Sequence, residues 1–161
     1  MSESDPEVTM LRHTVATLAY RAAKVLLDAP PEIATFRASE TTRTPGEILA
    51  HMGDLFDWAL GLADGVHEWH DSEPLPWEEE IARFYEALEA FDQRLASGVP
   101  LGNSVRRVFS GPVADALTHT GQLAMLRRMY GAPVRGENYF KADIQVGRTG
   151  PEQAAPLVEF E

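Results

Sequence analysis

The chain of 161 residues contains no cysteine, and this absence excludes several kinds of site. Disulfides, a thiolate nucleophile and cysteine-ligated metal sites all require a side chain that is not there. No apolar run approaches the roughly 20 residues that a membrane-spanning helix needs. The first ten residues, MSESDPEVTM, lack the basic and apolar regions of a secretory signal peptide. We therefore expect a soluble, cytoplasmic protein.

Positive charge is also scarce, since 14 Lys and Arg residues oppose 25 Asp and Glu residues and leave a net charge of −11. A sequence-independent grip on nucleic acid requires a basic face that displaces counterions from phosphates. An acidic protein likewise gains nothing from the anionic inner surface of a membrane. We therefore expect neither nucleic acid nor a membrane as a partner. A small-molecule substrate is expected instead from the open three-ligand site described below.

The charge is unevenly distributed along the chain. Residues 64–92 contain ten acidic side chains and a single basic one, whereas residues 104–135 contain five arginines and one acidic residue. This pattern is typical of a solvated acidic helix beside a helix with basic ends. It is also compatible with a self-complementary homodimer surface, or with a basic rim that attracts an anionic substrate.

Apolar residues recur at steps of three and four in four segments, and this spacing predicts four helices. Thr44-Pro45-Gly46-Glu47 predicts a capping box at the start of the second helix. Four helices of this length favour an all-α four-helix bundle, here a single domain over residues 1–161. The helices are expected at about residues 8–25, 45–64, 77–97 and 110–130.

The connections add two expectations. Residues 66–76 and 98–111 are both long for a link between adjacent antiparallel helices, so one of them is expected to be a crossover. Residues 134–161 show no helical stripe, which predicts an irregular tail packed on the bundle.

Three polar residues are placed where they could face the interior of the bundle. His51 lies three residues after Ile48 and four before Leu55, so it borders the buried stripe of the second helix. Asp115 and His119 lie one turn apart on one face of the fourth helix. Two imidazoles and a carboxylate from facing helices predict a three-ligand site for zinc, nickel or iron, with open coordination positions.

Simpler interpretations of the same residues remain open. His51 is equally compatible with a half-buried core histidine. Asp115 and His119 could form a surface ion pair worth about 0.2–0.5 kcal/mol. If the site exists, Glu47 is a candidate partner for the ring N–H of His51, and Gly121 would let a neighbouring helix approach closely.

The remaining histidines and aromatic residues carry less information. His67 and His70 are expected in an acidic loop, and Trp58 could line the same cavity as His51. Tyr139 and Arg148 could also shape the pocket. No Ser-His-Asp set, phosphate loop or dinucleotide fingerprint stands out.

At these residues the chain resembles the DinB (YfiT-like) superfamily of bacterial four-helix-bundle metalloproteins. The resemblance rests on GEILAH ending at His51 and on HTGQ beginning at His119, and it extends over nearly the whole chain. Further similar stretches are residues 74–77, 91–92 and 136–148. The family pattern usually supplies three histidines to the metal. Here the resemblance implies His51, Asp115 and His119, with aspartate in place of one histidine.

Characterised members of that family include S-transferases and isomerases that use a low-molecular-weight bacterial thiol. The resemblance therefore implies a divalent-metal-dependent enzyme with a thiol cosubstrate, and a homodimer. A chain without cysteine would have to import its sulfur nucleophile. The alternative is a non-catalytic metal- or small-molecule-binding, stress-associated bundle with a relic site. A metal-activated hydrolase is a third possibility, with Glu47 or Asp54 as the general base.

Overall fold

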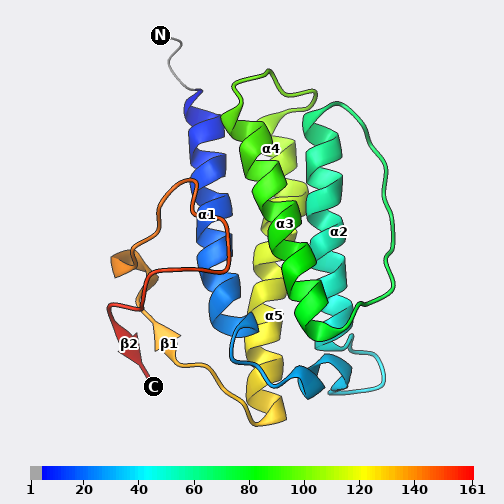
Figure 1. Cartoon of the computed structure of the whole chain (residues 1–161), viewed down its shortest axis with the longest axis vertical. Coiled ribbons are helices and arrows are strands. Elements are labelled where there is room, and N and C mark those ends of the chain that lie inside the picture. Colours follow the sequence, from blue (N-terminus) through cyan, green and yellow to red (C-terminus); the bar gives the residue numbers. More distant parts are fainter. Residues whose placement is uncertain (1–4) are drawn as a thin grey trace.

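Four long helices form the all-α bundle that the sequence predicts, as the computed structural model shows (Figure 1). The structure describes residues 5–161, so the first four residues of the predicted domain, and of the segment compared with a signal peptide, lie outside it. None of the described helices combines the length and the apolar character needed to cross a membrane. The helices are α1 (Pro6–Leu26), α2 (Pro45–Ala63), α3 (Trp77–Ala96), the short α4 (Val105–Val108) and α5 (Ala114–Tyr130).

The predicted capping box is present at the start of α2. Thr44 Oγ1 accepts a hydrogen bond from the backbone N–H of Glu47 at 3.2 Å. The Glu47 carboxylate in turn accepts from the backbone N–H of Thr44 at 2.9 Å. These bonds satisfy N–H groups that the first turn of a helix leaves without a partner, so they set the position at which α2 begins.

Helices α2 and α3 are parallel neighbours, and residues 66–76 form the crossover between them. Near the end of both helices, Arg94 Nε donates to Asp64 at 2.6 Å, while earlier in both helices Arg83 donates to the carbonyl of Ala50 at 3.2 Å. The connection therefore has to return along the whole bundle, and it does so on the outside of α2 (Figure 1). Of the two long connections in the sequence, residues 66–76 are therefore the crossover.

The fourth helical segment begins earlier than predicted. It starts with α4, passes through a π-helical turn over Phe109–Val113 and continues as α5. Pro112 lies inside this turn and has no N–H to donate, so it interrupts the regular bonding ladder. The π turn ends two residues before Asp115 and sets the rotation at which α5 presents its face to α2.

The tail contains a short ladder that the sequence did not predict. Strand β1 (Gly136–Glu137) pairs antiparallel with β2 (Glu159–Phe160) beside α1 (Figure 1). Tyr20 on α1 donates a hydrogen bond to Glu137, and Lys24 forms an ion pair with the same carboxylate at 2.8 Å. These contacts confirm that the tail packs on the bundle.

Candidate metal centre

The three predicted ligands meet between α2 and α5. The Nε2 atom of His51 lies 3.3 Å from Oδ2 of Asp115, and the Nε2 atom of His119 lies 3.3 Å from the same oxygen. The two imidazole rings approach edge to face, with centroids 4.8 Å apart. Both histidines are largely buried, whereas the Asp115 side chain is 44% exposed. The cluster therefore sits at the edge of the core, with its carboxylate reachable from solvent.

Gln122 determines how His119 presents its ring. Its Oε1 atom is assigned 2.7 Å from Nδ1 of His119; with the amide oxygen in that position, the proton of a neutral imidazole resides on Nδ1. The lone pair of Nε2 then points toward Asp115, which is the arrangement that a metal-binding histidine requires. Gln122 thus accepts a ring N–H, the role expected of Glu47, but it does so from His119 rather than from His51.

The donor set fits a divalent metal ion. Ligand atoms held tetrahedrally at about 2.0–2.1 Å from zinc lie about 3.3–3.4 Å from one another. Both nitrogen-to-oxygen distances, at 3.3 Å, match that spacing. His51 can also meet Asp115 by donating a proton from Nε2, but a neutral His119 cannot, because its proton faces Gln122. A neutral His119 and an ionised Asp115 therefore face each other with lone pairs, and either a second proton on His119 or a metal ion can bridge them.

Sequence analysis placed Glu47 and Gly121 near this centre in roles that the structure does not support. Glu47 is occupied by the capping box and by Arg37, whose guanidinium lies at 3.1 Å. The backbone hydrogen bond from Thr44 lowers the pKa of Glu47 further than burial raises it. A Cβ atom at Gly121 would meet no atom within 4 Å among the described residues, so no neighbouring helix approaches there.

The crossover supplies one wall of the centre. Trp69 packs edge to face against His51, with centroids 5.3 Å apart, and against Trp58 at 5.7 Å. His67 packs on the other side of Trp58 at 5.5 Å. The Trp69 ring therefore packs on both His51 and Trp58, so Trp58 is linked to His51 through Trp69. The loop position predicted for His67 and His70 is confirmed.

Asp54 fastens this crossover to α2. Its carboxylate accepts the backbone N–H of Ser72 at 2.9 Å and the Ser72 hydroxyl at 2.6 Å. It also pairs with Arg83, which forms further ion pairs with Glu80 at 2.9 Å and Asp57 at 3.0 Å. Burial works to lower the pKa of Arg83, but its bonds to these three carboxylates raise it above the ordinary value. Asp54 and Glu47 therefore both hold other groups, which removes the two bases considered for a hydrolase.

A cavity of about 710 Å³ opens from the three ligands. Its lining continues along α5 and includes residues 38, 39 and 41–43 of the connection between α1 and α2. Its size lies within the roughly 300–1,000 Å³ typical of small-molecule sites. The centre is thus accessible to a ligand larger than water.

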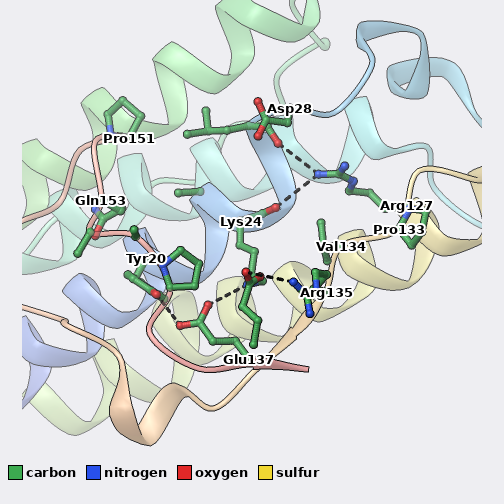
Figure 2. A pocket seen from close by; sticks show the side chains of 16 residues that line it. Tyr20, Lys24, Asp28, Arg127, Pro133, Val134, Arg135, Glu137, Pro151 and Gln153 are labelled. Atoms are coloured by element: carbon green, nitrogen blue, oxygen red, sulfur yellow. Dashed lines mark hydrogen bonds and ion pairs between the residues drawn. The ribbon is translucent and has the colours of Figure 1, made fainter. Parts of the chain in front are cut away.

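A second cavity, of about 520 Å³, lies between the tail and α1, and its charges are matched internally (Figure 2). Lys24 forms ion pairs at 2.8 Å with both Glu137 and Glu159, and Tyr20 donates to Glu137. These contacts hold the tail against α1. Tyr139, predicted to shape the metal pocket, instead packs under Arg21 of α1 at 4.0 Å.

Arg148, the other tail residue considered for the pocket, is also absent from the lining of the metal-centre cavity. It donates to the backbone carbonyl of Asp143 at 3.0 Å. No role at the centre was predicted for Gln122 or Trp69, which contact the histidines directly. Gln122 could have been found from its position one turn after His119. Trp69 belongs to an irregular connection, for which periodicity gives no signal.

Comparisons of the chain with protein-family models, with curated proteins and with solved structures return no significant match. The resemblance to the DinB superfamily therefore rests on the residues quoted above.

Proposed function

We propose that this protein is a divalent-metal-dependent enzyme of the DinB type that transfers or isomerises a group with a small bacterial thiol as cosubstrate. His51, Asp115 and His119 would hold the metal. The observation that carries the proposal is the convergence of two Nε2 atoms on one carboxylate oxygen, each at 3.3 Å, at the end of an open cavity.

The chemistry of the chain supports a thiol as the nucleophile. A bound divalent cation would stabilise a thiolate over a thiol at neutral pH. The chain has no cysteine of its own, so a sulfur nucleophile would come from a cosubstrate. The residues of the chain would then orient the reactants: Gln122 sets the tautomer of His119, and Trp69 closes the side of His51 that faces the crossover.

Metal content tests the first half of the proposal. Protein purified without a nickel column is measured by inductively coupled plasma mass spectrometry, beside His51→Ala, His119→Ala and the control His70→Ala. His70 is exposed in the crossover and belongs to no cluster of potential ligands in residues 5–161. We expect close to one metal ion per chain in the wild type and in His70→Ala, and none in the other two variants. Wild-type protein that takes up no zinc, nickel or iron(II) would favour the relic-site alternative.

Thiol consumption tests the second half. The metal-loaded protein is incubated with cysteine or a glucosamine-based thiol and a chlorodinitrobenzene electrophile, and the loss of thiol is followed. We expect the wild type to exceed the uncatalysed rate and Asp115→Ala to fall to it. Stoichiometric metal without any turnover would leave a metal-binding protein and reject the enzyme.

A further inference from the structure

Two methionines on α5 extend the face that carries the metal ligands. His119, Gln122, Met125 and Met129 follow one another at steps of three and four, so they lie along one side of the helix. Met125 is 65% exposed and Met129 is 57% exposed. Both line the cavity that begins at the metal centre, together with the buried Leu126 and Ile48. The cavity therefore has an apolar wall, and its two exposed methionines take no part in the packing of the core.

The other wall is mostly polar and carries one positive charge. It is formed by the connection before α2, and Arg43 is the only basic residue among the described residues that line the cavity. Within residues 5–161 no hydrogen bond or ion pair to Arg43 is found, although its charge helps to lower the pKa of Glu47. Its neighbour Arg37, by contrast, donates to Glu47 at 3.1 Å and to the carbonyl of Thr42 at 2.6 Å.

The two walls together define a ligand class. We propose that this cavity binds a small molecule with an apolar body and an anionic group, the body lying on Met125, Leu126 and Met129 and the anion meeting Arg43. This inference rests on the proposed function, since the molecule would be the electrophilic substrate brought to the metal centre.

The charge of Arg43 should select anionic over cationic ligands, and the methionines should determine how many ligand shapes the cavity accepts. A cationic group in the same position would face the guanidinium of Arg43. Among the described residues that line the cavity, the one acidic side chain is Asp115, which is assigned to the metal. Methionine side chains are flexible and adapt to ligands of different shape. The cavity therefore discriminates by charge and apolar character more than by the outline of the ligand.

Three probes of equal chain length separate these contributions. Octanoate, 1-octanol and octylammonium, each below its micelle concentration, are titrated calorimetrically into zinc-loaded wild-type protein and variants, and the zinc content of every sample is measured. Arg43→Gln is expected to bind octanoate about fivefold more weakly, the most that an exposed ion pair usually contributes. Its affinity for octanol is expected to stay the same. Met129→Gln should weaken the binding of octanoate and octanol alike.

Two controls make the outcome decisive. Arg37→Gln removes a basic residue from the same connection that does not line the cavity, and it should bind octanoate like the wild type. His51→Ala, without zinc, should still bind octanoate through Arg43. Loss of octanoate binding in His51→Ala with retention in Arg43→Gln would show that the carboxylate meets the metal, and would overturn the proposal. Equal affinity of the wild type for octanoate and octylammonium would also overturn it. Both results are binding measurements that do not depend on turnover. Failure of this proposal can therefore be distinguished from failure of the thiol-consumption assay.

Discussion

Two polar clusters lie one turn apart on α2, and they differ in how their charges are balanced. Asp54 is 4% exposed, and its carboxylate receives two hydrogen bonds from Ser72 and an ion pair from Arg83. His51, three residues earlier, meets only Asp115 among the described acidic groups. The Asp54 cluster contains its own cation, Arg83. The His51 cluster consists of two imidazoles and a carboxylate, which are all groups that can bind a cation.

This difference distinguishes a structural network from a site. A buried carboxylate with a complete set of donors gains nothing from a further ligand, and its removal harms the fold. A carboxylate that faces two imidazole nitrogens from the rim of the core costs the fold little if it is lost. We therefore expect the Asp54 cluster to contribute to stability, whereas the His51 cluster is the one that could hold a metal ion.

The largest effect is expected from removal of the cation in the Asp54 cluster. Arg83→Met would leave Asp54 and the fully buried Glu80 without their partner. We expect the free energy of unfolding to fall by about 3–5 kcal/mol, measured by urea denaturation. Arg106→Met is the matched control, because Arg106 is exposed and pairs with Glu7 at 2.7 Å. Its loss should cost at most about 1 kcal/mol, and an equal cost for the two variants would contradict the comparison.

The second effect concerns the His51 cluster. Zinc at 100 times its dissociation constant should raise the free energy of unfolding by about 2.7 kcal/mol, because it binds the folded chain. Asp115→Ala should abolish this increase while changing the stability of the metal-free protein by less than about 0.5 kcal/mol. Asp57→Ala, which removes another exposed carboxylate, should keep the response to zinc. A response that survives in Asp115→Ala would remove this residue from the site.

A smaller effect links the two clusters through the crossover. Ser72→Ala removes the hydroxyl that donates to Asp54 at 2.6 Å, and should lower the free energy of unfolding by about 1 kcal/mol. Trp69, which is 37% exposed, lies three residues away and packs on His51, so the tryptophan emission of the protein should change as this contact loosens. Ser97→Ala, which removes an exposed hydroxyl that bonds the Arg94 carbonyl, should leave the fluorescence unchanged. An unshifted spectrum in Ser72→Ala would show that the crossover is held by other contacts.

The smallest effect concerns the beginning of α2, the helix that carries both clusters. The hydrogen bond from the Thr44 backbone lowers the pKa of Glu47 below its ordinary value of 4.5. A carboxylate with a depressed pKa stabilises the folded state above that value, and the contribution is lost as the pH falls through the folded pKa. Glu47→Gln should therefore cost about 0.5 kcal/mol at neutral pH and nothing in strong acid. Thr44→Ala should remain costly at both pH values, and a pH-independent effect of Glu47→Gln would contradict this account.

Local patterns predicted most of the helical architecture. The capping box at Thr44 lies at the start of α2, and Trp77 is the first residue of α3, because both signals act within a single turn. The fourth segment was predicted to begin at about residue 110, where Ser110-Gly111-Pro112 resembles a helix start, but Pro112 lies within a π turn that follows α4. A proline is favourable at a helix start, so the sequence could not distinguish the two positions.

The candidate site was predicted in part, for the same reason. Asp115 and His119 are neighbours within one helix, so their spacing alone placed them on one face. The approach of His51 to them depends on how α2 packs against α5. Arg43 and Trp69 come from connections whose paths no periodicity describes, and the structure places them at the cavity and at the metal centre respectively.

The helices, the absence of any cysteine ligand and the spacing of Asp115 and His119 follow from the sequence, because each depends on composition or on contacts within a few residues. Three features come from the packing alone: α2 and α3 run parallel, two imidazoles converge on one oxygen, and Arg43 lines the same cavity as two exposed methionines. These features join residues tens of positions apart. Their distances follow from the packing of whole helices and from the path of the crossover, which short-range spacing does not encode.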